Sequence, residues 1–151
     1  MATYLADTNL LLRLADPASP QHLVATESLS RLFRQRDEIF LTAQNFIEFW
    51  AVATRPLDAN GFGWTVERAK REVSELQERF PLLTDSPDIF PRWLELVNQF
   101  SITGKRVHDA RLAAVLLSHN IENLLTFNTA DFSAFPWLSC INPNSLVQHA
   151  G

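Results

Sequence analysis

The chain has 151 residues, of which 46% are hydrophobic and 20% are charged, with only 4 glycines and 8 prolines. This length suits one domain that buries most of its apolar surface in a single core, and the composition excludes a disordered chain. We therefore expect one domain over residues 1–151.

The net charge of −4 counts against nucleic-acid binding, because affinity for phosphates rests largely on Lys and Arg. Two details weaken this objection. Divalent metals would neutralise part of any acidic cluster. The basic residues are nearly all arginines, with Lys70 and Lys105 as the two lysines, and Arg can hold a phosphate with two parallel hydrogen bonds. Genome composition explains the arginine bias equally well.

The number of cysteines and the first residues of the chain indicate the cellular compartment in which the protein works. Cys140 is the single cysteine, which excludes an internal disulfide and an all-cysteine metal site. The first residues include no basic segment, and no apolar run reaches the roughly 20 residues that a membrane span needs. We expect a cytoplasmic protein that is neither secreted nor inserted in a membrane.

Short apolar runs alternate with amphipathic segments along the chain. In chain order we expect a strand over 3–6, a helix from Leu10, a helix over 20–36, a strand over 38–41, a helix over 43–54, a helix over 64–80, a strand over 81–83, a helix over 89–100, a polar loop over 101–107, a helix over 109–119, a strand over 121–127 and an edge strand over 139–141. This alternation predicts an α/β fold, a three-layer α/β/α sandwich with a parallel central sheet.

Acidic residues follow two of the predicted strands. Asp7 comes directly after the first strand, and Asn128 and Asp131 follow the strand over 121–127. Ligands of open parallel sheets bind outside the carboxyl ends of the strands, which gives these positions functional weight. Taken alone, Asp7 is more simply interpreted as the N-cap of the helix that follows it.

Glu48 stands in an unusual place for a carboxylate, among four large apolar residues in the segment Phe46-Ile47-Glu48-Phe49-Trp50. We expect it to be partly buried. A buried carboxylate is costly unless it pairs with a cation or binds a metal. The alternative is an ion pair with Arg55 or another arginine.

Asp109 opens the predicted helix over 109–119, where its charge would complement the helix dipole. For this position alone, a helix cap is the favoured interpretation. The histidines of the chain show no metal-ligand spacing such as H-E-x-x-H, so a zinc site has little support.

Several acids lie at strand ends and helix starts. This coincidence favours a shared metal site over separate helix caps and ion pairs. Carboxylates with water suit Mg²⁺ or Mn²⁺, and these ions commonly serve phosphoryl transfer. The sequence contains no P-loop, nucleophile elbow or dinucleotide fingerprint that would indicate another chemistry.

Four segments together resemble PIN-domain ribonucleases, particularly the VapC-like toxins of bacterial toxin–antitoxin pairs. They are Leu5-Ala6-Asp7-Thr8-Asn9, Asn45-Phe46-Ile47-Glu48-Phe49-Trp50, Val107-His108-Asp109-Ala110-Arg111-Leu112-Ala113-Ala114 and Leu124-Leu125-Thr126-Phe127-Asn128-Thr129-Ala130-Asp131-Phe132. Each segment alone is a weak signal, while all four at these separations are fairly specific, and the resemblance covers nearly the whole chain.

The resemblance implies a single PIN-like domain over 1–151 that cleaves RNA with Mg²⁺ or Mn²⁺ held by Asp7, Glu48 and Asp109. It also implies a homodimer and an antitoxin partner that blocks the site. The fourth acid of the family often falls at the position of Asn128. Either Asn128 orients water or substrate, or Asp131 supplies the missing charge. The resemblance is compatible with one bound metal ion or with two.

Several neighbours are candidates for supporting roles. Thr8, Asn9 and Thr126 are expected to hold the carboxylates by hydrogen bonds, and Arg111 is expected to position the phosphate backbone. Lys105 and Arg106 could share that role or form a solvated loop. Trp50, Phe62 and Trp64 are candidates for an antitoxin groove, with ordinary core positions as the alternative.

Two other functions compete with the nuclease. A metal-dependent phosphatase or receiver-like domain would share the fold class, but the sequence lacks an Asp-x-Asp pair after the first strand and a nucleophilic Asp with a partner lysine. A PIN-like binding module that has lost catalysis is the other alternative, and Asn128 and the negative net charge are its best evidence.

Overall fold

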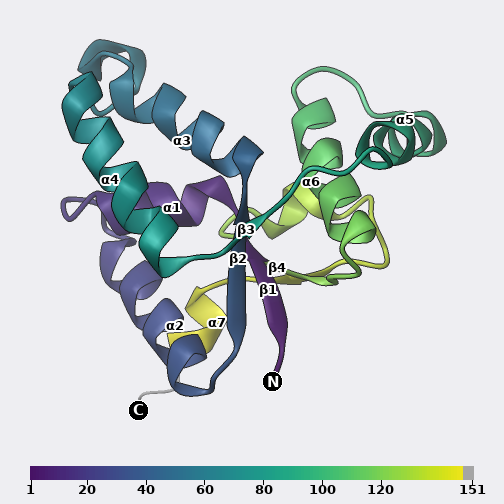
Figure 1. Ribbon diagram of the computed structural model, residues 1–151, viewed down its shortest axis with the longest axis horizontal. Helices are drawn as coiled ribbons and strands as arrows, with labels where there is room; N and C mark the ends of the chain where they lie inside the picture. Colours follow the sequence, from purple (N-terminus) through teal and green to yellow (C-terminus); the bar gives the residue numbers. More distant parts are fainter. Residues whose placement is uncertain (148–151) are drawn as a thin grey trace.

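The computed structural model describes residues 1–147 and forms a three-layer α/β/α sandwich around a parallel sheet (Figure 1). In the described residues the sheet has five strands in the order β3-β2-β1-β4-β5, and each neighbouring pair is parallel. The strands are β1 Thr3–Ala6, β2 Glu38–Thr42, β3 Leu82–Leu83, β4 Asn123–Leu125 and β5 Ser139–Ile141. The predicted fold class is confirmed, and residues 148–151 of the expected domain lie outside the described part.

Helices cover both faces of the sheet (Figure 1). One face carries α1 Thr8–Ala15, α2 His22–Arg34, α3 Ala43–Thr54, α4 Val66–Arg79 and α7 Asn144–Val147, and the other carries α5 Ile89–Gln99 and α6 Arg106–Ser118. Two 3₁₀ turns, η1 Leu57–Ala59 and η2 Thr129–Phe132, lie in the connections. None of the helices formed by residues 1–147 is long and apolar enough to cross a membrane.

The central strands contribute to two separate cores. Leu5 and Leu124 pack on the side of α5 and α6, while Ala6 and Leu125 pack on the side of α1 to α4. All four side chains are fully buried. Because successive strand residues point to opposite faces and both faces are covered, consecutive residues of β1 (Leu5-Ala6) and β4 (Leu124-Leu125) are apolar, without polar alternation.

The strand register brings the carboxyl ends of three strands, β1, β2 and β4, to the same end of the sheet. Ala6 of β1 pairs with Leu125 of β4, and the N–H of Asp7 donates to the carbonyl of Leu125 at 2.9 Å. On the other side of β1, Leu5 pairs with Phe40 of β2. The chain leaves this edge into α1, α3 and the turn after β4, so residues just past each strand become neighbours.

The helix that carries Asp109 begins earlier than the sequence predicts. α6 starts at Arg106, inside the expected loop over 101–107. Gly104 has a φ of +62°, and the N–H of Val107 donates to its carbonyl at 3.2 Å, which begins the first turn. Lys105 and Arg106 are exposed, so the apolar periodicity that marks a helix starts only after them. The short α7 was not expected either.

Candidate active site

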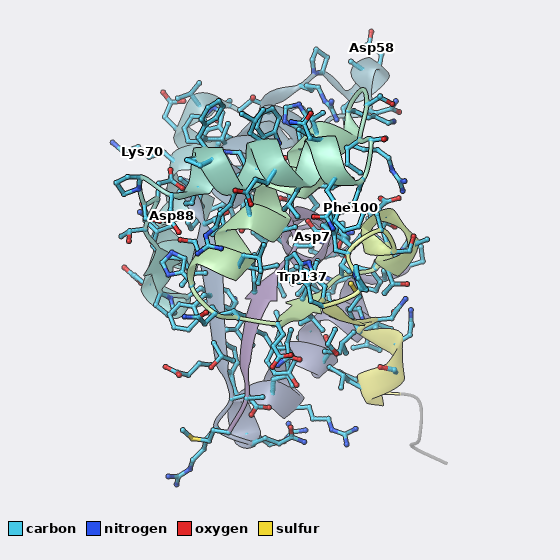
Figure 2. All side chains as sticks on the ribbon, turned by 90° about the vertical axis from the view of Figure 1, so that its right-hand side faces the viewer. Asp7, Asp58, Lys70, Asp88, Phe100 and Trp137 are labelled. Carbon is cyan, nitrogen blue, oxygen red and sulfur yellow. The ribbon has the colours of Figure 1, made fainter. Side chains whose placement is uncertain are left out.

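Asp7 is partly buried and lies between the end of β1 and the start of α1, near the middle of the view in Figure 2. Its Oδ1 accepts a hydrogen bond from the N–H of Thr8 at 2.7 Å, so Asp7 is the N-cap of α1. Its Oδ2 accepts from the hydroxyl of Thr126 at 2.8 Å and from Nδ2 of Asn9 at 3.3 Å. The simple cap interpretation is therefore correct for one carboxylate oxygen, and the other oxygen is directed toward the end of β4.

Thr126 and Asn9 join the turn after β4 to the start of α1. The hydroxyl of Thr126, which is fully buried, accepts from Nδ2 of Asn9 at 3.1 Å and from the N–H of Asn128 at 3.0 Å while it donates to Asp7. Oδ1 of Asn9 accepts from the N–H of Phe127 at 3.2 Å. These bonds fix the orientation of the Asp7 carboxylate.

Glu48 lies in the middle of α3 and is partly buried, as its apolar neighbours predict. Its Oε1 accepts from the hydroxyl of Thr8 at 2.7 Å, and its Oε2 accepts from Nε2 of Gln44 at 3.2 Å. No Lys or Arg among residues 1–147 forms an ion pair with it. The alternative of a neutralising arginine is wrong, and Arg55 instead donates to the carbonyl of Asn60 at 3.3 Å.

Asn45 is a buried residue of the site that the sequence reasoning missed. Its Oδ1 accepts from both the N–H and the hydroxyl of Thr42 at 2.9 Å, and its own N–H donates to that hydroxyl, which closes a capping box at the start of α3. Its Nδ2 donates to the hydroxyl of Thr8 at 3.1 Å. The three-residue spacing from Thr42 is the signal that could have found it. Asn45 thus holds Thr8 in place to bond Glu48.

Asp109 lies in the first turn of α6 and is partly buried. The N-cap position belongs to Lys105, so the interpretation of Asp109 as the cap is wrong. Among the hydrogen bonds and ion pairs of residues 1–147, none involves the Asp109 carboxylate. Both of its oxygens are therefore free for a ligand.

The two candidates for a fourth acidic role differ in their surroundings. Asp131 lies in η2, and its carboxylate is 3.4 Å from the guanidinium of Arg106 in a half-exposed ion pair. Asn128 is exposed and precedes η2, and within residues 1–147 its side-chain amide has no hydrogen-bond partner.

The carboxylates influence one another's protonation. Burial raises the pKa of Asp7 to about 6, while hydrogen bonds from Thr126 and Thr8 oppose the rise and the charges of Glu48 and Asp131 add to it. Burial is also the main reason that the pKa of Asp109 rises to about 6. The charges of Asp7, Asp131 and Glu48 add to that rise, and Arg106 opposes it. Because such effects weaken with distance, the four acids lie in the same region of the molecule.

The donor set fits a hard cation in its chemistry but is not arranged as a finished metal cage. Within the described residues, no three Asp, Glu, His or Cys side chains lie close enough to share one ion as they stand. All donors are oxygens, and Asp109 has no partner among the described residues. Burial, and to a lesser degree the neighbouring acids, raise the pKa values of Asp7 and Asp109, and a bound cation would favour the charged form of both. Asp7, Glu48 and Asp109 could together hold Mg²⁺ or Mn²⁺.

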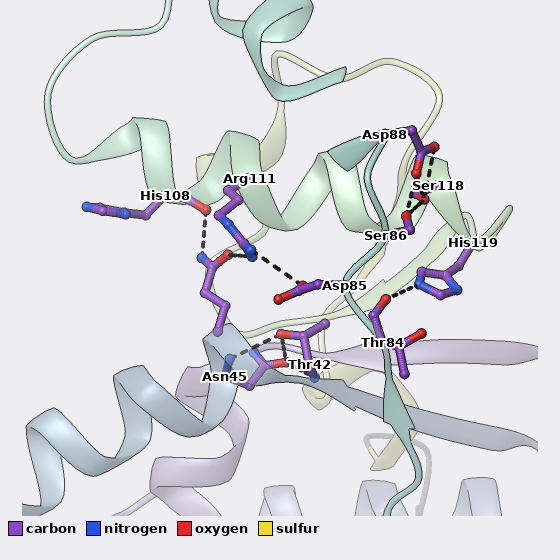
Figure 3. A network of polar contacts seen from close by, with 11 residues as sticks. Thr42, Asn45, Thr84, Asp85, Ser86, Asp88, His108, Arg111, Ser118 and His119 are labelled. Carbon is purple, nitrogen blue, oxygen red and sulfur yellow. Dashed lines mark hydrogen bonds and ion pairs between the residues drawn. The ribbon is translucent and has the colours of Figure 1, made fainter. Parts of the chain in front are cut away.

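Arg111 of α6 is held beside this site by two partners (Figure 3). Its guanidinium donates to Oε1 of Gln44 at 3.2 Å and lies 3.4 Å from the carboxylate of Asp85. Gln44 also donates to the carbonyl of His108 at 2.8 Å, in addition to its bond to Glu48. The sequence predicted a substrate role for Arg111 but not its partners, which no local pattern marks.

The parallel α/β sandwich, with acids gathered at the carboxyl ends of its central strands, defines the class of this domain. Residues 4–138 match the family model of the PIN domain, and the chain belongs to that family. The family predicted from the four sequence segments is confirmed.

Solved toxin–antitoxin proteins have a similar fold. VapBC2 from Rickettsia felis, bound to a DNA fragment from its promoter, gives a TM-score of 0.72 at 17% identity over 93% of this chain and 98% of that chain. VapBC-1 from nontypeable Haemophilus influenzae gives 0.70 at 22% identity over 94% and 98%. VapC20 from Mycobacterium tuberculosis, a sarcin–ricin loop cleaving toxin, gives 0.63 at 17% identity over 87% and 95%. No curated protein sequence matches. The chain is a PIN domain with structural similarity to VapC toxins.

We predict that Asn45→Ala destabilises the protein far more than the same change at Asn98. The substitution removes the partner of Thr42 and leaves the Thr8 hydroxyl without its donor, which costs about 3 kcal/mol of unfolding free energy. Asn98 is exposed and bonds only the carbonyl of Leu94, so Asn98→Ala should change stability by less than about 0.5 kcal/mol. Urea denaturation measures both, and equal effects would contradict the buried role of Asn45.

We predict that Asp109→Asn stabilises the metal-free protein at neutral pH. Because the folded pKa of Asp109 lies above its ordinary value, wild-type stability falls as the pH rises from about 4 to about 6 and stays low above that range. A two-unit shift corresponds to roughly 3 kcal/mol. Partial exposure reduces the expected gain to about 1 kcal/mol.

Thermal denaturation in EDTA at pH 7.5 and pH 4 measures this gain. The stabilisation by Asp109→Asn should be present at pH 7.5 and absent at pH 4. Asp58→Asn is the matched control, because Asp58 is an exposed acid in η1, remote from Asp7 (Figure 2). A gain of equal size at both pH values would contradict the electrostatic origin.

Proposed function

We propose that this chain is a Mg²⁺- or Mn²⁺-dependent endoribonuclease and the toxin of a toxin–antitoxin pair. The observation that supports the proposal most is a PIN-domain fold in which Asp7 and Asp109 both have raised pKa values, mainly through burial and in part through the charges of Glu48 and other nearby acids. Perturbed carboxylates that lie together are more typical of functional sites than of structural ion pairs.

Each of the three acids has a defined part in this proposal. Asp7 presents a carboxylate whose orientation is fixed by Thr126, and Glu48 presents one fixed by Thr8. Asp109 has both oxygens free among the described residues. A divalent cation held there would neutralise phosphate charge and lower the pKa of an attacking water. No side-chain nucleophile is then required.

We propose Asp131, and not Asn128, for the fourth acidic role. The charge of Asp131 raises the pKa of both Asp7 and Asp109, so it acts on the same place as they do. The exposed amide of Asn128 is left to contact water or substrate. Arg111 would hold the phosphate backbone, exchanging its contact with Asp85 for a phosphate oxygen.

An antitoxin partner and a homodimer belong to the same proposal. Some of the similar structures are complexes, including a toxin–antitoxin complex from Klebsiella pneumoniae. In this chain, Ile47 of α3 is 69% exposed, and Trp50 helps to line an open apolar cavity beside it. Phe62 and Trp64 instead pack against the core, as the core alternative predicted for them. An exposed apolar surface of this kind supports a protein partner.

We predict that Asp7→Asn and Asp109→Asn each lower RNA cleavage by at least about 100-fold, because each removes a charge from the cation site without changing side-chain shape. The assay uses single-stranded RNA with Mn²⁺, and with EDTA as the metal-free comparison. Asp58→Asn, at an exposed acid outside the site, is the control and should cleave like wild type.

The competing functions give different results in parallel measurements. Turnover of a generic phosphomonoester without RNA cleavage would support the phosphatase alternative and contradict the nuclease. Calorimetric titration with Mn²⁺ tests the binding module. No binding, or binding that Asp7→Asn leaves unchanged, would favour a PIN domain that has lost catalysis.

We predict that Asp131→Asn raises the Mn²⁺ concentration needed for half-maximal RNA cleavage by about tenfold and that Asn128→Ala raises it by less. The reason is that loss of one nearby charge weakens attraction of a cation by roughly 1 kcal/mol or more. Initial rates at saturating RNA over a range of Mn²⁺ concentrations measure both variants. A larger rise for Asn128→Ala would give the role to Asn128 instead.

A further inference from the structure

An apolar cavity of about 480 Å³ opens next to the candidate active site. It lies between α5, the start of α6 and the segment 84–88 that joins β3 to α5. Ile89, Phe90, Trp93 and Val107 form its apolar wall. Metal binding by the carboxylates would not require such an apolar wall.

This cavity continues toward the carboxylates. A second cavity of about 400 Å³ lies between α3 and α6 and is lined in part by Glu48 and Gln44. Asp85, His108 and Arg111 line both cavities. Figure 3 shows these three residues between the start of α6 and the segment that leads to α5. One path therefore runs from Glu48 past Arg111 to the apolar wall.

Two stacked aromatic rings form the far end of this path. The rings of Phe90 and Trp93 lie 5.8 Å apart between centroids with an interplanar angle of 26°. Nε1 of Trp93 donates to the carbonyl of Val107 at 2.8 Å, which fixes that ring and satisfies its polar atom. Phe90 is 65% exposed, so a large flat apolar face is open to solvent.

The wall of the cavity is held in place without a ligand. Asp88 accepts a hydrogen bond from the hydroxyl of Ser118 at 2.9 Å, and Ser86 lies 2.7 Å from the same hydroxyl. Nε2 of His119 lies 2.8 Å from the carbonyl of Thr84 (Figure 3). These bonds fasten the segment 84–88 to α6, so the cavity is formed in advance of binding.

We propose that this cavity binds an unpaired base of the RNA substrate, stacked on Phe90, while Arg111 contacts the phosphate between that base and the carboxylates. The inference rests on the proposed nuclease function and names a substrate-positioning site for it. Single-stranded RNA is commonly recognised by stacking of splayed bases on aromatic side chains.

The position of Arg111 and the continuity with the carboxylates favour RNA over a protein segment as the occupant. A protein segment would need only the apolar wall, whereas a nucleotide would place its base on the wall and its phosphate at Arg111, in exchange for the Asp85 carboxylate that Arg111 now contacts. Arg111 also lies on the side that leads to Glu48, where the phosphate backbone must continue to reach the cleavage site. The aromatic wall and the carboxylates therefore fit two parts of one RNA strand.

Phe90 variants test the proposal through RNA binding in EDTA, with fluorescence anisotropy of a labelled single-stranded oligonucleotide of mixed sequence. Stacking on one base corresponds to about a tenfold change in Kd. Phe90→Ala and Phe90→Leu should weaken binding by about that factor, because both lose the flat face. Phe90→Tyr should bind like wild type. Leu23→Ala on α2, at a residue 64% exposed, controls for loss of an exposed apolar side chain.

An oligonucleotide that consists of abasic sites isolates the stacking contact. Wild type should bind it about tenfold more weakly than the intact RNA, while Phe90→Ala should bind both with similar Kd. With Mn²⁺, Phe90→Ala should raise KM by about tenfold and leave kcat nearly unchanged. Melting temperatures of all variants should match wild type, because Phe90 is largely exposed.

Unchanged Kd and KM in Phe90→Ala would overturn the inference and leave the cavity to a protein surface, while cleavage by wild type would still support the nuclease. Equal weakening by Phe90→Ala and Phe90→Tyr would also overturn it, since stacking would not be the cause. If wild type neither binds nor cleaves RNA, the proposed function fails and the inference fails with it.

Discussion

The carboxylate of Asp7 connects the end of β1, the start of α1 and the turn after β4, and the rest of the site is arranged around it. One oxygen caps α1 through Thr8, and the other accepts from Thr126. The hydroxyl of Thr8 then reaches Glu48 on α3. These contacts exist because β1 lies between β2 and β4 in the sheet, with Ala6 level with Leu125.

The site acids differ physically from an acid that serves the fold. Asp88 receives hydrogen bonds from Ser86, Arg92 and Ser118, and these bonds lower its pKa. The surroundings of Asp7 and Asp109 raise the pKa of each, so the fold disfavours their charged forms. Keeping Asp7 and Asp109 charged lowers the stability of the fold. Burial of apolar residues in the two cores offsets this loss. This contrast supports the proposed role of Asp7 and Asp109.

The sequence predicts the fold and the partial burial of Glu48 because both leave local signals. Apolar runs bounded by polar residues mark the strands, and the apolar neighbours of Glu48 mark its partial burial. The supporting contacts leave no such signal. Gln44 and His108 are separated by 64 positions, and Arg111 and Gln44 by 67, so their meeting depends on how α3 and α6 approach the sheet edge. The early start of α6 was hidden for a different reason, since its first residues are exposed and polar.

The charge balance bears on how an RNA strand would be held. The net charge is −4, and the two arginines nearest the carboxylates are already in contact with acids, Arg106 with Asp131 and Arg111 with Asp85. A phosphate must compete with a carboxylate for each guanidinium, so phosphate contacts contribute less affinity than in a basic nucleic-acid-binding domain. Stacking of a base on Phe90 does not depend on net charge. An acidic protein that acts on RNA therefore has a physical reason to place an exposed aromatic face beside its carboxylates.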